Sequence, residues 1–150
     1  MNQDLINSVE NMFKKYPELN YGIKQDINEV NEVNKKLSNM IPQWFIELIT
    51  QYPVCGLEVG MPDYKDIILA KINGIYSNTA ELSPGYLIKD KGYLCISSDA
   101  TGMGDPLFVS VNEGDNPPVY CIYHDANTDN PDKHLVANKL SDFFDMATMV

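Results

Sequence analysis

The segment from Gly92 to Tyr123 constrains the fold most, because short apolar runs alternate there with connections rich in glycine, aspartate and proline. We expect three strands, at Tyr93 to Ile96, Leu107 to Val111 and Val119 to Tyr123. Gly102 and Gly104 lie in the first connection, where they permit backbone angles that other residues avoid. The segment therefore predicts a meander of antiparallel strands.

Apolar residues at helical spacing predict amphipathic helices on both sides of this meander. In the first helix Leu5, Val9 and Met12 share one face, and Pro17 stops the run. We expect helices at residues 3–15, 25–38, 42–52 and 135–147. Helices, then strands, then a closing helix indicate an α+β fold, in which N-terminal helices and a C-terminal helix pack against a mostly antiparallel sheet from residues 86–123.

Shorter segments are assigned from their local pattern. The run from Asp66 to Tyr76 fits a helical period but is rich in isoleucine, which also suits strands, and we assign it as a helix. Leu57 to Val59 is assigned as a short strand, and Tyr86 to Ile88 as the start of the sheet. With 150 residues and 44% hydrophobic content, we expect a single domain over residues 1–150.

The charge balance restricts the possible partners. Eleven basic residues against twenty-one acidic ones give a formal net charge of −10. Such a chain repels phosphate backbones and anionic membranes, so we expect no nucleic-acid or membrane partner. It would attract a basic protein instead. The alternative is that the acidity only keeps the protein soluble.

The amino terminus and the cysteines predict a reduced, cytoplasmic protein. The first residues lack the basic start and apolar core of a signal peptide, and no apolar run approaches the roughly 20 residues that cross a bilayer. Cys55, Cys95 and Cys121 are odd in number and widely spaced. This spacing does not suit a zinc site, so we expect three buried free thiols and no metal.

Two motifs could bind a phosphate or a cation, and both have simpler explanations. Gly102-x-Gly104 is not followed by a lysine and does not open a predicted helix, so a hairpin turn is favoured over a phosphate site. The loop from Asp125 to Asn130 matches the first, third and fifth positions of a calcium loop. It lacks the glycine at the sixth position, and Val136 replaces the glutamate at the twelfth, so a polar loop is favoured.

An enzyme that uses a thiol is the second class of function considered. Cys95 or Cys121 could act as a nucleophile with His124, because all three lie on or next to adjacent predicted strands. No hydrolase or protease signature surrounds either thiol, and core cysteines with a surface histidine are the favoured interpretation. We therefore expect no catalytic residues.

Carboxylates concentrate in the connections of the predicted meander. A rigid sheet could present them together as a binding surface for a basic partner. The candidate partner-binding residues are Asp99, Asp105, Glu113, Asp115, Asp125, Asp129 and Asp132. The alternative is that turns are made of aspartate in any case.

The chain resembles the SUKH superfamily, which includes the yeast glucan-synthesis regulators and many bacterial immunity proteins. The segment from Gly92 to Val111 is similar to the central segment of that superfamily. The stretch from Leu37 to Ile49 resembles its step from an apolar-proline pair into a new helix, and Lys139 to Phe144 resembles its closing helix. The family usually has glutamate at the position of Asn34. The resemblance covers roughly residues 27–146 and implies an α+β fold.

The resemblance also implies a function. It points to a non-catalytic, cytoplasmic immunity protein that needs no cofactor and neutralises a polymorphic or contact-delivered toxin by blocking it. A toxin that acts on nucleic acid needs a basic surface, so the expected partner is a basic protein, such as a nuclease. The alternative within this class is a regulatory scaffold of cell-wall glucan synthesis. The sequence sets neither the identity of the toxin nor the oligomeric state.

Overall fold

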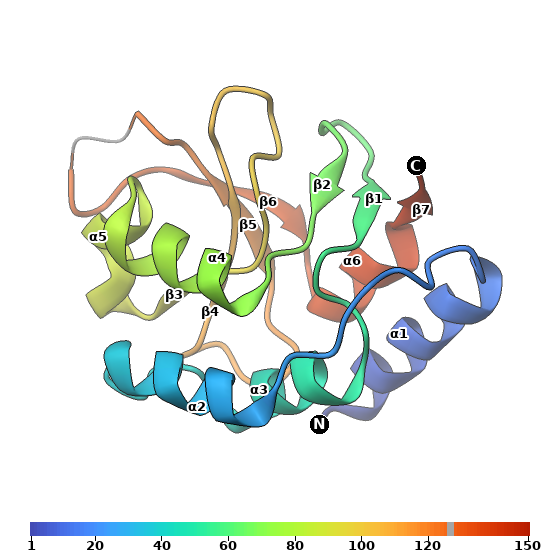
Figure 1. Ribbon diagram of the computed structural model, residues 1–150. Coiled ribbons are helices and arrows are strands. Elements are labelled where there is room, and N and C mark those ends of the chain that lie inside the picture. The colour runs from blue at the N-terminus through green and yellow to red at the C-terminus, as the bar shows by residue number, and fades with distance from the viewer. Residues whose placement is uncertain (126–127) are drawn as a thin grey trace.

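The computed structural model describes residues 1–125 and 128–150, and its elements form an α+β architecture (Figure 1). The helices are α1 (Gln3–Lys15), α2 (Ile27–Lys36), α3 (Gln43–Gln51), α4 (Ile72–Tyr76), α5 (Gly85–Ile88) and α6 (Leu140–Met146), with the short helical turns η1 (Ser77–Glu81) and η2 (Lys89–Lys91). The strands are β1 (Glu58–Gly60), β2 (Ile67–Ile68), β3 (Tyr93–Cys95), β4 (Leu107–Ser110), β5 (Val119–Ile122), β6 (Lys133–Ala137) and β7 (Thr148–Met149).

The predicted meander forms the larger of two antiparallel sheets. Its strands follow the order β3-β4-β5-β6, with Leu94 opposite Val109 and Leu107 opposite Cys121. A smaller sheet has the order β2-β1-β7, so the end of the chain returns to pair with β1. Helices α2 and α3 run along the lower side of the view in Figure 1, and α1 and α6 lie together at the right. The α+β fold is therefore confirmed.

Each face of the larger sheet packs against a different group of side chains. The inner face contributes Leu94, Val109 and Cys121 to the main core, which also holds Leu5 of α1 and Phe143 of α6. The outer face carries a second, smaller cluster, formed by Ile88, Cys95, Phe108, Tyr120 and Ile122. The strands of the meander are apolar on both faces because both are largely covered.

The first three helices confirm the sequence prediction. Side chains cap two of them: the Asn2 side chain accepts hydrogen bonds from the N–H groups of Asp4 and Leu5, and Asp26 accepts one from Glu29. Helix α3 begins directly after Pro42, and Trp44 is half-buried beside Phe45 with a ring-centroid distance of 5.7 Å. Helices α2 and α3 are each shorter at both ends than predicted.

The predicted helix over residues 135–147 is wrong in its first part. Residues Lys133–Ala137 form β6, and α6 begins only at Leu140. Val136 fits the helical spacing of Leu140 and Phe143, but Val136 also fits a strand beside β5, where Tyr120 pairs with Leu135. Pairing with β5 decided between two patterns that the sequence leaves equally open.

Two further assignments are corrected. The run from Asp66 to Tyr76 is not one helix: Ile67–Ile68 forms β2, and only Ile72–Tyr76 is α4. The segment Tyr86 to Ile88 is part of α5, not of the sheet. Both errors come from short isoleucine- and leucine-rich runs, whose periodicity suits either structure. The short strand expected at Leu57 to Val59 is present as β1, shifted by one residue.

Candidate functional site

The connection between β3 and β4 is folded around the carboxylate of Asp99. One oxygen, Oδ1, accepts hydrogen bonds from the N–H groups of Thr101 (3.0 Å), Gly102 (2.9 Å) and Asp105 (3.1 Å). Gly102 has φ +83°, a left-handed conformation that glycine adopts without strain. These bonds outweigh partial burial and lower the pKa of Asp99. The expected hairpin turn is therefore held by an aspartate at its base.

Asp105 fastens this turn to the connection that follows β5. Its side chain is 6% exposed, and its Oδ1 accepts a hydrogen bond from the N–H of His124 at 2.6 Å. The same oxygen lies 2.7 Å from His124 Nδ1, and Oδ2 accepts from the Thr101 hydroxyl at 2.7 Å. Burial alone would raise the pKa of Asp105, but these hydrogen bonds lower it below its usual value.

The seven candidate carboxylates divide between the two ends of the larger sheet. Successive connections of an antiparallel meander alternate ends, so the β4–β5 connection lies opposite the other two. The residues at the end that holds His124 are Asp99, Asp105, Asp125, Asp129 and Asp132, and the other end holds Glu113 and Asp115. The expectation that one surface presents all seven is wrong.

Burial and internal contacts divide the candidates further. Asp105 is buried, so the expectation that its carboxylate forms part of the exposed surface is also wrong. Glu113 accepts a hydrogen bond from the Tyr120 hydroxyl at 3.0 Å, and Asp115 accepts one from the Asn2 side chain at 3.3 Å. We name the remaining group the acidic rim: Asp99, Asp125, Asp129 and Asp132.

His124 lies among these carboxylates with about two fifths of its side chain exposed. Its hydrogen bond to Asp105 raises the pKa of the imidazole, and the charges of Asp125 and Asp99 raise it further. His124 therefore supplies a positive charge beside the acidic rim when it is protonated.

Sequence reasoning missed the most exposed apolar side chain of this region. Met103 lies at the tip of the β3–β4 turn and is 69% exposed, and its N–H donates to the Thr101 hydroxyl at 3.1 Å. The turn is also held from the side, because Lys65 N–H donates to the carbonyl of Ala100 at 2.8 Å. A methionine between two glycines was the available signal, but the glycines alone explained the turn.

A second polar cluster lies on the outer face of the larger sheet. Lys133 Nζ donates to the Tyr93 hydroxyl at 3.0 Å and lies 4.5 Å from the ring centroid of Tyr120. The Tyr120 hydroxyl in turn donates to Glu113. Burial and the nearby Glu113 raise the pKa of Tyr120. This cluster joins three strands and holds the ammonium group of Lys133, the one lysine of β6, against the outer face of the sheet.

The three thiols are buried and free, as expected. Burial raises the pKa of Cys55 and Cys95 to about 12 and that of Cys121 to about 11. Cys95 lies on the outer face of the sheet and Cys121 on the inner face. Their sulfur atoms donate to the carbonyls of Ser97 and Asp105, and neither is hydrogen-bonded to His124 among the described residues. The geometry needed for a Cys–His nucleophile is therefore not present in them.

Across residues 1–125 and 128–150, no group of three histidine, cysteine, aspartate or glutamate side chains is placed to hold a metal ion. The calcium-like loop includes residues 126 and 127, which lie outside the described residues. Within the described part of the chain, every helix is too short or too polar to cross a membrane.

Comparison with known proteins shows the family of this chain. The model of the SMI1 / KNR4 family (SUKH-1) matches residues 25–146, which includes every element from α2 to α6. The chain belongs to this family. No curated protein and no solved structure matches the chain. The SUKH-1 family is generally non-catalytic and is of the immunity-protein or glucan-regulator type. Helix α1 lies outside the matched residues, yet it packs against α6 within the same core.

Proposed function

We propose that this SUKH-1 chain is a cytoplasmic immunity protein that neutralises a basic, polymorphic or contact-delivered toxin by blocking it. Family membership supports a binding role without catalysis. The formal net charge of −10 favours a basic partner, and a nuclease is the kind of toxin that needs a basic surface. Regulation of cell-wall glucan synthesis is the alternative that the same family membership supports.

The observation that carries this proposal is the position of Met103. Met103 is 69% exposed on a turn that Asp99 and Asp105 hold in place, and the acidic rim lies at the same end of the larger sheet. A binding hot spot usually has a central side chain that is buried on binding, surrounded by residues that exclude water from it. Because the turn is already ordered, a partner does not have to order it on binding, and less free energy is lost.

The blocking mechanism is steric and electrostatic. The acidic rim attracts a basic toxin over a distance of roughly 8–10 Å at ordinary ionic strength. Docking then places Met103 against the toxin and removes the rim carboxylates from water, opposite its lysines and arginines. Charge pairs of this kind raise the association rate and set specificity more than they raise affinity.

The test starts from the reading frame beside the gene. A neighbouring frame whose product ends in a basic, nuclease-like domain supplies the toxin for co-expression. We expect cells that carry both proteins to grow and cells that carry the toxin alone to stop growing. We also expect the purified proteins to form a stable complex. A toxin that kills cells despite this chain, and that does not bind it, would rule out the immunity role for that pair.

A substitution at the tip of the turn tests the site itself. Met103→Ala should weaken the complex by about tenfold or more, the loss typical of a hot-spot side chain. Ile27→Ala is the matched control, because Ile27 is a 46% exposed apolar residue on α2, at the opposite side of the molecule (Figure 1). Equal affinities of the two variants would place the contact surface elsewhere.

A further inference from the structure

Three connections of the chain meet at His124. Its backbone N–H donates to Asp105 of the β3–β4 connection, and its carbonyl accepts a hydrogen bond from the Ser83 hydroxyl, between η1 and α5, at 2.7 Å. The ring packs against Gly104, where an added Cβ atom would lie 3.4 Å from His124 Cγ. Contacts of both the backbone and the ring therefore fix the position of His124 at this end of the larger sheet.

Exposed apolar side chains lie around this position. Met103, Leu82 and Tyr123 are all exposed. Each of them is the residue directly before His124 or directly before Gly104 or Ser83, which contact it. His124 therefore lies at the centre of the surface on which the proposed docking site is built.

Asp105 determines which ring nitrogen of His124 is available to a partner. The buried carboxylate lies 2.7 Å from Nδ1, and an ionised carboxylate can only accept, so the neutral ring carries its proton on Nδ1. Nε2 then has a lone pair, and no described residue hydrogen-bonds to it, while about two fifths of the side chain is exposed. Neutral His124 is thus an acceptor at Nε2, and protonated His124 is a positively charged donor.

Titratable and charged groups face this ring from the elements packed around it. They are Asp99 and Asp105 of the β3–β4 connection, Asp125 of its own connection, the Cys121 thiol of β5, and Tyr64 and Lys65 of the β1–β2 connection, of which Lys65 lies against Gly102. The hydrogen bond to Asp105 and the charges of the carboxylates raise the pKa of His124. The pKa of Asp99 and of Asp105 is lowered, and that of Cys121 is raised to about 11. His124 is therefore the group here that changes its charge near neutral pH.

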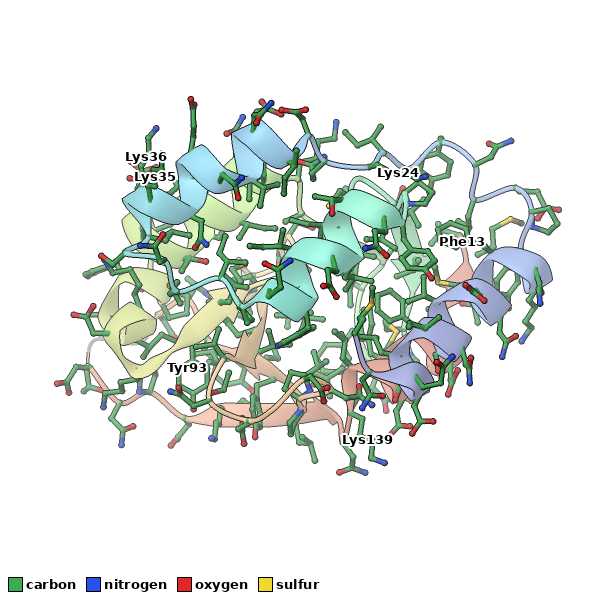
Figure 2. All side chains as sticks on the ribbon, turned by 90° about the horizontal axis from the view of Figure 1, so that it is seen from below. Phe13, Lys24, Lys35, Lys36, Tyr93 and Lys139 are labelled. Carbon is green, nitrogen blue, oxygen red and sulfur yellow. The ribbon has the colours of Figure 1, made fainter. Side chains whose placement is uncertain are left out.

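The lysines that Figure 2 labels on and before α2 lie away from this surface. Figure 2 views the molecule from below Figure 1, the end opposite the β3–β4 turn, and shows Lys24 before α2 and Lys35 and Lys36 at its end. Carboxylates at the His124 end and lysines at the other end orient a basic partner toward His124 as it approaches.

We propose that His124 is a specificity-determining residue of the docking site and binds the basic partner only in its neutral form. Nε2 accepts a hydrogen bond from a lysine or arginine N–H of the partner, while Asp105 holds the opposite nitrogen. A proton on Nε2 removes this acceptor and places a positive charge against the cation of the partner. Affinity therefore falls with the pH, toward a limit of about tenfold for each pH unit below the pKa of His124. This inference rests on the proposed immunity function and adds its dependence on pH.

The first test measures the affinity for the toxin from the neighbouring reading frame at pH ~6 and pH ~8 by calorimetry. The wild type should bind several-fold more tightly at the higher pH. His124→Gln places a side-chain amide near the position of Nε2 and does not titrate, so its affinity should be the same at both pH values. His124→Asn keeps only the contact at Nδ1 and should bind weakly at both.

The other histidine supplies the matched control. His134→Asn removes a titrating ring from the next strand and should keep the pH dependence of the wild type. Histidines of the toxin titrate in every one of these mixtures, so a difference between variants belongs to this chain. A wild type whose affinity does not change with pH, or a pH dependence that persists in His124→Gln and His124→Asn, would overturn the proposal.

A lysine decapeptide tests the same inference without the toxin. At low salt the peptide should shift the NMR signals of the His124 ring and of the Met103 and Gly104 N–H groups at pH ~8, and much less at pH ~6. His124→Asn should show equally small shifts at both pH values. Equal shifts of the wild-type signals at both pH values would refute the role of His124. A toxin that binds at neither pH would count against the immunity function for that pair, and the peptide would still decide this inference.

Discussion

The carboxylate of Asp105 is buried and lies 2.7 Å from the ring nitrogen Nδ1 of the half-exposed His124. The same oxygen accepts the N–H of His124, so backbone and ring are held by one atom. The two residues are 19 positions apart and join the β3–β4 turn to the end of β5. Through this pair the stability of the turn that carries Met103 depends on a titratable histidine.

The first prediction concerns the dependence of stability on pH. The pKa of His124 is raised in the folded protein, so its stabilising contribution is complete below its unfolded value of about 6.5 and is lost as the pH rises through the folded pKa. The pKa of Asp105 is lowered from 3.8, so its contribution is present above 3.8 and is lost as the pH falls through the folded value. We expect the pair to stabilise the fold most between these two values.

Chemical denaturation across this pH range provides the measurement. His124→Asn is the informative variant, because its side-chain N–H can occupy the position of Nδ1 without titrating. The wild type should lose stability above pH ~6.5 as His124 loses its proton. The variant should not show this loss. An NMR titration of the His124 ring gives the independent check. A ring pKa at or below 6.5 would contradict the assignment.

The second prediction concerns Asp99. Asp99→Ala removes the acceptor of three backbone N–H groups and should lower the free energy of unfolding by about 1–2 kcal/mol. Asp99→Asn keeps a side-chain oxygen and should cost less. Asp129→Asn is the control, because Asp129 is exposed and its replacement removes the same charge. Equal stability of the alanine variant and the control would show that the turn does not depend on Asp99.

These contacts change how the carboxylates must be tested for binding. Replacement of Asp99, Asp105 and Asp129 together would be expected from the sequence alone to leave the fold intact. The structure contradicts this expectation, because two of the three hold the β3–β4 turn and Asp105 is buried. Binding variants should therefore be restricted to the exposed residues of the rim.

The sequence predicted those parts of the fold that local patterns determine. Helix α1 was predicted with the observed ends from the helical spacing of its apolar residues and from Pro17, and the structure adds the cap by Asn2. The three strands of the meander were recognised because glycine and aspartate separate them. Strand β6 was missed because Val136 also fits a helical spacing with Leu140 and Phe143. The pairing of the small sheet was missed because it joins residues distant in sequence, such as Val59 and Met149. No local pattern encodes such a pairing.

The candidate site was predicted only in part for the same reason. The sequence identified the carboxylates and the connections that carry them. Their division between two ends of the sheet follows from the strand order. The contact of Asp105 with His124 depends on the β4–β5 register, which the composition of the turns does not reveal. The exposure of Met103 also required the structure, because a methionine is more often buried.

The third prediction concerns the thiols. Because burial raises the pKa of Cys55, Cys95 and Cys121, we expect all three to react slowly with a thiol reagent in the folded protein. The same thiols should react quickly after denaturation. A single thiol that reacts at once under native conditions would revive the hypothesis of a Cys–His enzyme, and mass spectrometry would identify it.

The fourth prediction concerns Asn34 of α2. The Asn34 side chain accepts a hydrogen bond from the N–H of Ile41 at 2.9 Å and donates one to the carbonyl of the same residue at 3.4 Å. It thereby closes the connection between α2 and α3. Asn34→Ala should lower the free energy of unfolding by about 1–2 kcal/mol, and Asn34→Asp, which keeps only the acceptor, should cost less. Thermal denaturation of the two variants checks the order, and the reverse order would contradict it.

The last prediction rests on the proposed immunity function and concerns the speed of binding. Replacing Asp125, Asp129 and Asp132 by asparagine removes three exposed charges of the acidic rim and leaves the Asp99 and Asp105 contacts in place. Association with the toxin from the neighbouring reading frame, followed by stopped-flow fluorescence, should slow several-fold and become less sensitive to salt. Both effects are expected because long-range attraction raises association rates and is screened by ions.

A second triple variant separates this effect from the loss of net charge. Glu18, Glu32 and Asp145 are also exposed, and their replacement by glutamine or asparagine changes the net charge by the same amount on other faces of the molecule. If the rim guides the partner, this control should retain most of the wild-type association rate, since screening confines attraction to roughly 8–10 Å. Equal rates for the two variants would show that the acidity acts as a whole. In that case the charge would serve solubility and general attraction, and the rim would not be the docking site.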